Sequence, residues 1–344
     1  MTEAARSFGW AVIGPGRIAH RFAGAVTALP AMHLQAVWGR SLAKAEAFAQ
    51  AWPNAGPQAG MPEASVDLQR LLNDPQVHGV YIATPHAQHL VFAQQALQAG
   101  KPVLCEKPLV PNERQGQALV SLARERGVFL MEAVWTRYLP IYDVVAEWLR
   151  SGAIGELRSL QSSFCFHLPY DPSHRCYAPE LAGGALLDIG IYNLTATRWV
   201  LAAALGHCPE PLHLHTRALL APTGVDQRLH VQMEFEGGVS SQFVCGFDGW
   251  AENTLNIQGE HGHIVVHDGF WHSTRASLHR GMQPSQEVTR PFLANGFEGE
   301  VAAAVEAVRH GQLEEPRMPH DETMATLRWM DRIRAQAGVR YPFE

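Results

Sequence analysis

The sequence predicts an α/β domain followed by an α+β domain: a doubly wound parallel sheet, then a mainly antiparallel open sheet. Residues 8–133 alternate short apolar runs with helical patterns, and parallel strands need such helical crossovers. From residue 157 onward, runs in which apolar and polar residues alternate are typical of half-exposed antiparallel strands. We therefore expect domains at 1–138 and 139–344, with the C-terminal helices as candidates for packing back on the first domain.

The first domain opens with an apolar strand at 8–13, which ends at Gly14, and a helix at 17–28, in which apolar residues recur at helical spacing. The remaining elements follow in the same alternation. We expect further strands at 34–38, 79–83, 102–105 and 128–133, a loop at 53–62, a short helix capped by Asp67, and longer helices at 41–52, 87–98 and 112–126.

The second domain is expected to contain a hairpin. Residues 228–236 alternate throughout, Gly237-Gly238 supplies a two-residue turn, and 239–245 form the return strand. Other strands are expected from 157, at 212–220 and at 254–267, with helices at 141–149, 186–203, 297–310 and 321–337.

Composition restricts the class of partner. With 27 basic and 33 acidic residues the net charge is −6, which offers no overall positive field for nucleic acid. No stretch is apolar for long enough to span a membrane, and the N-terminus lacks the pattern of a signal peptide, so we expect a cytoplasmic protein. Five cysteines form no CxxC pair, and histidines that alternate on strands lack further ligands, so no metal site is expected. A small-molecule partner fits best.

A glycine-rich turn follows the first strand and opens the first helix, which is the context of a dinucleotide fingerprint. Gly14 permits the tight turn, Gly16 lets backbone amides approach a pyrophosphate, and Ala19 allows close packing of helix on strand. The helix N-terminus adds partial positive charge for the anion. The expected cofactor residues here are Gly14, Gly16, Arg17, Ile18 and Ala19.

The end of the second strand indicates which dinucleotide is bound. NAD sites generally have an acidic residue there, but this chain has Arg40 and Ser41 and no carboxylate. A guanidinium can form a charge-assisted fork with a 2′-phosphate, and Ser41 can add a hydroxyl or an amide. We therefore expect NADP rather than NAD.

Two more motifs lie at the carboxyl ends of expected strands, where ligands bind in such folds. Thr84-Pro85-His86, with His89, follows one strand, and Glu106-Lys107-Pro108 follows the next. A partly desolvated lysine in that position can orient a hydroxyl or shift the pKa of a neighbour.

Five segments resemble, in the same order, the Gfo/Idh/MocA oxidoreductases, the family of glucose-fructose oxidoreductase and inositol dehydrogenase: GPGRIA, TPHAQH, AGKPVLCEKPL, GVFLMEAVWTRYLP and GGALLDIGIYNLTATRWVL. The last two look most similar to the branch of glucose-fructose oxidoreductase, NADP-dependent xylose dehydrogenase and dimeric dihydrodiol dehydrogenase. The resemblance covers nearly the whole chain and implies an N-terminal Rossmann domain.

The resemblance also implies roles for individual residues. Lys107 matches the catalytic lysine, and Tyr192 matches the tyrosine that donates and accepts the proton in this branch. Asp188, four residues before Tyr192 on one expected helix, shares its face and would orient a hydroxyl of an aldose or cyclic diol. Which of Lys107 and Tyr192 accepts the proton stays open at this point.

The sequence gives less specific evidence for the residues that would line the substrate cleft. Trp135 and Arg137 look similar to the family's substrate and nicotinamide walls, and His167 and Arg175 are candidates for substrate contact. An aromatic core anchor, surface ion pairs and a strand-end histidine are equally good explanations for these four residues.

Three functions remain open on sequence alone. The leading one is an NADP-dependent dehydrogenase for an aldose or a cyclic trans-diol. The alternatives are a sugar-sugar oxidoreductase with tightly bound NADP and a binding module that senses dinucleotide without turnover, although the latter can dispense with Lys107 and Tyr192. Only one face of the second sheet can pack on its own helices. Because the family that the chain resembles commonly pairs sheet to sheet, the resemblance implies a homodimer through this sheet.

Overall fold

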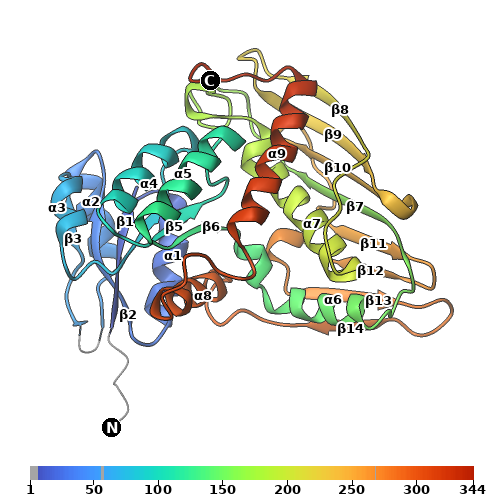
Figure 1. Ribbon diagram of the computed structural model, residues 1–344, viewed down its shortest axis with the longest axis horizontal. Helices are drawn as coiled ribbons and strands as arrows, with labels where there is room; N and C mark the ends of the chain where they lie inside the picture. Colours follow the sequence, from blue (N-terminus) through green and yellow to red (C-terminus); the bar gives the residue numbers. More distant parts are fainter. Residues whose placement is uncertain (1–6, 56–57, 268) are drawn as a thin grey trace, which may run out of the picture. The chain divides into compact units, whose positions relative to one another are not determined.

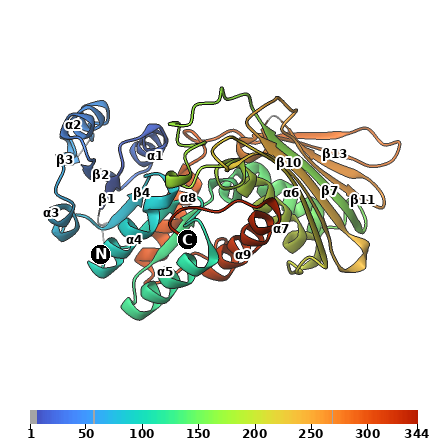
Figure 2. The same ribbon diagram turned by 90° about the horizontal axis from the view of Figure 1, so that it is seen from above.

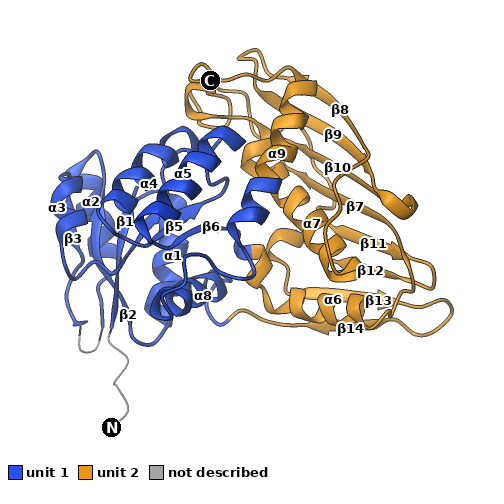
Figure 3. Cartoon of the chain, viewed as in Figure 1, with its two compact units in different colours: residues 1–135, 293–325 blue, residues 136–292, 326–344 orange. Residues whose placement is uncertain are grey.

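The computed structural model describes residues 7–55, 58–267 and 269–344, and it divides the chain into two compact units. Figure 3 shows unit 1, residues 1–135 and 293–325, and unit 2, residues 136–292 and 326–344. Residues 293–325 therefore belong to unit 1 although they follow the second sheet in sequence, and helix α9 (His320–Ala337) contributes residues to both units. In the described part of the chain, no helix is long and apolar enough to cross a membrane.

Unit 1 is built on a six-stranded parallel sheet of order β3-β2-β1-β4-β5-β6, as expected for a doubly wound fold. Its strands are β1 (Phe8–Ile13), β2 (Met32–Trp38), β3 (Glu63–Ser65), β4 (Gly79–Ile82), β5 (Val103–Glu106) and β6 (Leu130–Ala133). Its helices are α1 (Arg17–Ala28), α2 (Leu42–Ala51), α3 (Leu68–Asn73), α4 (His89–Gln98), α5 (Glu113–Arg126) and α8 (Glu298–Arg309).

The strand order reverses at β1, which pairs with β2 on one side and with β4 on the other. Helix α1 and the late helix α8 pack together, as do α4 and α5, and the two pairs lie on opposite faces of the sheet (Figures 1 and 2). Ligands of doubly wound folds bind at the carboxyl edge beside such a reversal.

Unit 2 contains an eight-stranded sheet of order β14-β13-β12-β11-β7-β10-β9-β8, in which only the β7–β10 pair is parallel. This confirms the mainly antiparallel sheet. Its strands are β7 (Leu157–Cys165), β8 (His213–Leu220), β9 (Asp226–Glu234), β10 (Ser240–Gly246), β11 (Leu255–Gly259), β12 (His263–Val266), β13 (Arg275–His279) and β14 (Gln286–Thr289).

Helices α6 (Pro140–Arg150) and α7 (Ile191–Leu205) pack on one face of this sheet (Figure 2). On β9, Leu229, Val231 and Met233 are buried, whereas His230 and Gln232 alternate onto the opposite face of the sheet and are exposed. We call this second side the outer face.

Several elements differ from the sequence-based expectation. The β9–β10 hairpin forms, but its connection has three residues, Glu236–Gly238, because Phe235 N donates to Val239 O (2.8 Å) and both glycines have positive φ. Strands β3, β13 and β14 were not expected from the sequence. The expected helix at 186–203 begins with a π-helical turn, Leu186–Gly190, before α7 starts.

Candidate functional site

The glycine-rich turn between β1 and α1 has the geometry of a dinucleotide cradle. Gly14 has φ +96°, and a Cβ there would lie 2.9 Å from Ala83 O, so only glycine fits. Gly16 caps α1 without any side-chain hydrogen bond, and a Cβ on Gly16 would meet only Ala83 O at 3.9 Å. The first turn of α1 thus leaves its amide groups uncapped by side chains, and Ala19 is fully buried against the sheet.

Arg40 and Ser41 lie beside this turn. Gly39 approaches it so closely that a Cβ would be 3.0 Å from the Pro15 ring. The Arg40 side chain is exposed, and Ser41 caps α2 by accepting a hydrogen bond from Lys44 N (3.4 Å). A guanidinium next to an anion-binding turn, without a neighbouring carboxylate in the β2–α2 turn, fits a dinucleotide with an extra phosphate.

The third loop of this edge, Thr84 to His89, is joined to the Glu106-Lys107-Pro108 loop by a buried histidine. The His89 ring lies 2.8 Å from Thr84 O and 2.9 Å from Pro108 O. Burial lowers the pKa of His89, so the neutral ring donates to one of these carbonyls at a time. His86 is also buried, and Pro85 caps the short 3-10 turn at His86–Gln88. His89 therefore holds the two loops together from within.

The Thr84 side chain also lies against the glycine turn. Its Oγ1 is buried and has no hydrogen-bond partner among the described residues, and its methyl group would meet a Cβ on Gly14 at 3.0 Å. Arg17 and Ile18, at the start of α1, are exposed and half-buried respectively. The residues of this edge thus fit a dinucleotide in backbone shape, charge and available donors.

Beneath Lys107 lies a buried acidic group. Glu106 accepts a hydrogen bond from the Tyr81 hydroxyl (2.5 Å) and one from Lys107 N (3.3 Å), so its carboxylate points into unit 1. Burial, together with the Glu106 charge, raises the pKa of Glu300 on α8 well above its usual range. Lys107 itself is half-buried at the surface of the same loop, and its peptide bond to Pro108 is cis.

Trp135 follows β6 and is part of a cluster of two aromatic rings and an arginine in unit 1. The Arg21 guanidinium lies 4.6 Å from its ring centre, and Phe297 lies 4.8 Å from it. Arg21 Nη2 also donates to Asn295 O (2.7 Å), and Asn295 Nδ2 donates back to Arg21 O (2.8 Å). The indole is therefore fixed by α1 and by the segment before α8.

In unit 2, Asp188 lies in the π-helical turn and Tyr192 in the first turn of α7. Both are largely buried, and Tyr192 packs near the Phe164 ring at 5.8 Å. The widened turn contains an i→i+5 hydrogen bond, Ile191 N to Leu186 O. Such turns occur frequently at functional sites.

Arg175 and Asp188 form an ion pair. Arg175 donates from Nη1 and Nη2 to the two carboxylate oxygens at 2.9 and 3.3 Å, and the Cys176 thiol lies 3.4 Å from Oδ2. The Arg175 side chain remains 44% exposed. His167 is exposed at the end of β7, in a bridge with Asp248, and Arg137 is buried in the 3-10 turn after Trp135.

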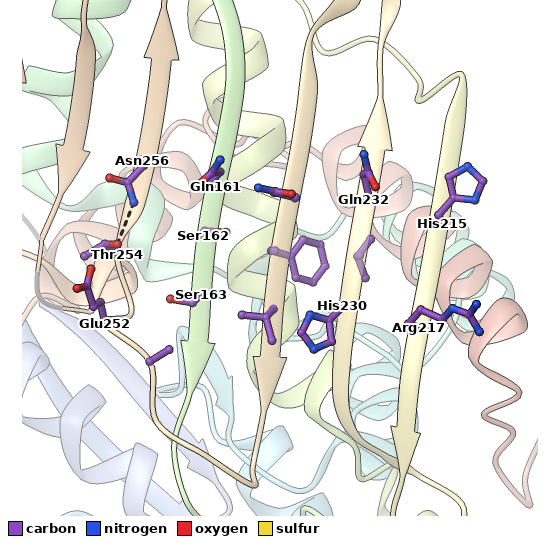
Figure 4. A pocket seen from close by; sticks show the side chains of 15 residues that line it. Gln161, Ser162, Ser163, His215, Arg217, His230, Gln232, Glu252, Thr254 and Asn256 are labelled. Atoms are coloured by element: carbon purple, nitrogen blue, oxygen red, sulfur yellow. Dashed lines mark hydrogen bonds between the residues drawn. The ribbon is translucent and has the colours of Figure 1, made fainter.

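The outer face of the unit 2 sheet carries a shallow polar pocket (Figure 4). Its labelled side chains come from strands β7, β8, β9 and β11 and from the loop before β11, and none of them was a predicted site residue. They include Gln161, His215, Arg217, His230, Gln232 and Asn256. The described residues contain no group of three or more side chains suited to a metal ion.

Sequence reasoning missed several residues around these sites. Glu300 had a local signal, because a carboxylate stands among the buried positions of α8, beside Val301 and Ala304. Arg21 lies one helical turn after Arg17. Asp226, which contacts the start of the π-helical turn, and Tyr341 had no local signal, because both meet their partners through contacts between distant segments.

Comparisons with known proteins match this architecture. A solved structure of KijD10, a 3-ketoreductase from Actinomadura kijaniata with NADP and TDP-benzene, is similar with a TM-score of 0.83 and 27% identity, over 96% of this chain and 98% of its own. An aldose-aldose oxidoreductase from Caulobacter crescentus shares the fold, with a TM-score of 0.84, 23% identity, and 97% and 98% coverage.

Curated relatives are similar over nearly their whole length. Proteins named trans-1,2-dihydrobenzene-1,2-diol dehydrogenase are 34% identical in Danio rerio (96% of this chain and 97% of that protein) and 32% identical in Mus musculus (97% and 98%). The model of an oxidoreductase family with an NAD-binding Rossmann fold matches residues 8–134, and the GFO/IDH/MocA C-terminal domain matches residues 142–265. The chain therefore belongs to the Gfo/Idh/MocA family of oxidoreductases and carries its nicotinamide-dinucleotide-binding Rossmann domain.

Proposed function

We propose that this protein is an NADP-dependent dehydrogenase that oxidises a ring hydroxyl of a cyclic trans-diol or an aldose. The observation that carries the proposal is the β2–α2 turn, where exposed Arg40 stands beside the glycine cradle in place of a carboxylate. The names of the relatives at 32–34% identity support the diol. The NADP in the KijD10 structure supports the cofactor.

The cofactor would be held by the carboxyl edge of the parallel sheet. The amides at Gly16 and Arg17 would bind the pyrophosphate, and Arg40, with Ser41, would bind the 2′-phosphate. Bound NADP supplies the acceptor for a hydride from the hydroxyl-bearing carbon. Trp135, fixed by Arg21, would form part of the nicotinamide wall.

Lys107 and Tyr192 would handle the substrate hydroxyl. As the carbon loses its hydride, the O–H bond breaks and the proton passes to the Tyr192 side chain, which acts as a phenolate and becomes a phenol. The Lys107 ammonium donates a hydrogen bond to the substrate oxygen. Glu106 holds the backbone of the lysine loop through Lys107 N. Support for these roles comes from the match of both residues to the family motifs.

Asp188 would act on the substrate through Arg175. Its two oxygens already accept hydrogen bonds from the guanidinium, which remains partly exposed. The Arg175–Asp188 pair would orient a second hydroxyl, which every trans-diol and aldose has next to the reacting one. His167 and Arg137 are weaker candidates for the same task.

A panel of cyclic trans-diols, aldoses and 1,5-anhydroketoses tests the activity, with NADP reduction or NADPH oxidation as the readout. We expect turnover of at least one class. Lys107→Met and Tyr192→Phe should each remove most of the turnover and leave the affinity for NADP unchanged. Full activity in either variant would reject the role of that residue, and no turnover of any compound would reject the proposed function.

The choice of dinucleotide is tested by Arg40→Asp. A charge-assisted pair is worth roughly 1.5–3 kcal/mol, so the affinity for NADP should fall roughly 10- to 150-fold, measured by calorimetry, with little loss for NAD. Arg114→Asp, at an exposed arginine in the same unit, is the matched control and should change neither affinity. An unchanged preference in Arg40→Asp would exclude the assignment.

The outer face of the second sheet is our candidate for a homodimer contact. It is free of helices among the described residues and presents hydrogen-bonding side chains such as Gln161, Gln232 and Asn256 in regular rows (Figure 4). Sedimentation equilibrium at micromolar concentration should give twice the chain mass of 37.9 kDa. A monomeric mass, or a dimer that Gln232→Arg leaves unaffected, would contradict this contact.

A further inference from the structure

The segment that carries Asp188 and Tyr192 starts at a glycine turn. Gly184 O accepts the first helical hydrogen bond of the segment, from Asp188 N (3.2 Å), and Gly184 N donates to Cys176 O (2.8 Å). A Cβ on Gly183 would lie 2.8 Å from Cys176 O, so the loop that carries Arg175 packs directly against this turn. The position of the turn thus determines the position of the helical segment that carries Asp188 and Tyr192.

Asp226, the first residue of β9, contacts this turn from the sheet. Its Oδ2 accepts a hydrogen bond from Leu186 N at 2.6 Å, and its Oδ1 would lie 2.3 Å from a Cβ on Gly184. The side chain is fully buried. A carboxyl group that accepts from the first amides of a helix fixes the start of that helix and receives its partial positive charge.

Tyr341, the fourth residue from the C-terminus, contacts the same turn from the segment that follows α9. Its hydroxyl donates to Gly183 O at 2.7 Å. The ring packs 4.9 Å from the Arg334 guanidinium, and Arg334 in turn forms two hydrogen bonds with Glu344, at 3.0 and 2.8 Å. The last residues of the chain are thus tied to α9 and, through Tyr341, to the turn.

The charges around Asp226 complete this arrangement. Burial raises the pKa of Asp226 to about 7, and the amides of Leu186 and Ala185 and the Arg334 charge oppose that rise. The other titratable groups near it are the Cys245 thiol and the Tyr341 phenol, whose pKa values burial raises. Asp226 is therefore a buried carboxyl group whose stabilising contacts come mainly from the turn itself.

We propose that Asp226 and Tyr341 are positioning residues that hold the Gly183–Gly184 turn. Through the turn, they also hold the Asp188–Tyr192 segment in the position that the reaction requires. The consequence for turnover rests on the proposed function, whereas the hold on the segment does not. Neither residue needs to touch substrate or cofactor. The turn is held from two sides, by a carboxyl group on β9 and by a phenol supplied by the C-terminal residues.

Hydrogen–deuterium exchange of the full-length protein tests the hold directly. Tyr341→Phe removes one buried hydrogen bond, so amides 184–192 should exchange roughly 5-fold faster. Tyr142→Phe is the matched control, because Tyr142 is another buried tyrosine of unit 2 whose hydroxyl donates to a backbone carbonyl, Phe270 O, at 3.0 Å. The control should leave exchange of 184–192 unchanged.

Asp226 is tested with a pair of variants. Asp226→Ala leaves Leu186 N without its acceptor and should also speed exchange of 184–192, whereas Asp226→Asn keeps an acceptor oxygen and should restore slow exchange. Turnover should fall several-fold in Tyr341→Phe and Asp226→Ala through kcat, with unchanged affinity for NADP and unchanged turnover in Tyr142→Phe.

Exchange of 184–192 at the wild-type rate in both Tyr341→Phe and Asp226→Ala would overturn the proposal, and so would faster exchange with undiminished kcat. A wild-type protein that turns over none of the diols and sugars would overturn the proposed function instead. The exchange rates would then still decide whether Asp226 and Tyr341 hold the segment, since that measurement requires no substrate.

Discussion

Asp226 should make the protein less stable as the pH rises from 5 to 8, and Asp226→Asn should remove that effect. The carboxyl group is fully buried, and its pKa is raised from 3.8 to about 7. Between these two values the native state holds a proton that the unfolded chain releases. The free energy of unfolding therefore falls as the pH rises through this window, and above about pH 7 the contribution is fully lost.

The size of the effect follows from the two pKa values. The rise from 3.8 to about 7 corresponds to a maximum of ~4 kcal/mol, at 1.36 kcal/mol for each pKa unit. Part of this is already lost at pH 5, which lies above the unfolded pKa. Integrating the linkage relation between pH 5 and pH 8 leaves about 2–3 kcal/mol for Asp226.

The measurement is urea unfolding, followed by tryptophan fluorescence, of the wild type and Asp226→Asn at pH 5, 6, 7 and 8. Asparagine does not titrate and keeps an acceptor for Leu186 N, so the variant should gain about 2–3 kcal/mol relative to the wild type between pH 5 and pH 8. Asp171→Asn is the control. Hydrogen bonds from Ser173 lower the pKa of that exposed carboxylate, so it is ionised throughout this range.

The pH dependence of the difference tests the reasoning, because contacts that do not titrate shift it equally at every pH. A difference between Asp226→Asn and the wild type that stays constant from pH 5 to pH 8 would refute it. So would an equal pH dependence in the Asp171→Asn control.

Three further predictions concern unit 1. Gly14→Ala places a Cβ 2.9 Å from Ala83 O at φ +96° and should lower the free energy of unfolding by about 1–3 kcal/mol. Gly16→Ala should have the same free energy of unfolding as the wild type but should bind the dinucleotide more weakly in calorimetry. Equal stability of the two variants would contradict this prediction. Burial raises the pKa of the Glu300 carboxyl group well above its usual range. Glu300→Gln should therefore match the wild type in urea unfolding near pH 4 and become the more stable of the two proteins as the pH rises. A stability difference that does not depend on pH would exclude a protonated Glu300. Burial of Glu298 raises the pKa of its carboxyl group, but backbone hydrogen bonds outweigh this effect and lower the pKa. Glu298→Gln should therefore be less stable than the wild type at pH 7, and the difference should disappear as the pH falls through the lowered pKa. A difference that persists at pH 2 would argue against this prediction.

Much of the fold and part of the site follow from patterns within a few residues. The alternation of strands and helices in residues 8–133 predicted the parallel sheet, and the residues of β9 predicted the hairpin. Strands β3, β13 and β14 were not predicted, because they are short and their polar residues give no clear alternation. The dinucleotide cradle was predictable because Gly14 must adopt a positive φ at the end of β1, and such a turn has a local sequence signature.

The sequence by itself determined the two-part architecture, the glycine cradle, the absence of an acidic residue in the β2–α2 turn, and the motifs that contain Lys107 and Tyr192. Only the tertiary structure decided what holds these groups. Tyr341 meets Gly183 across 158 residues, and Arg21 meets Asn295 across 274. Secondary structure and turn chemistry depend on near neighbours, which leave regular patterns in the sequence. A buried hydrogen bond between distant segments depends on how whole elements pack, and no local pattern of residues records it.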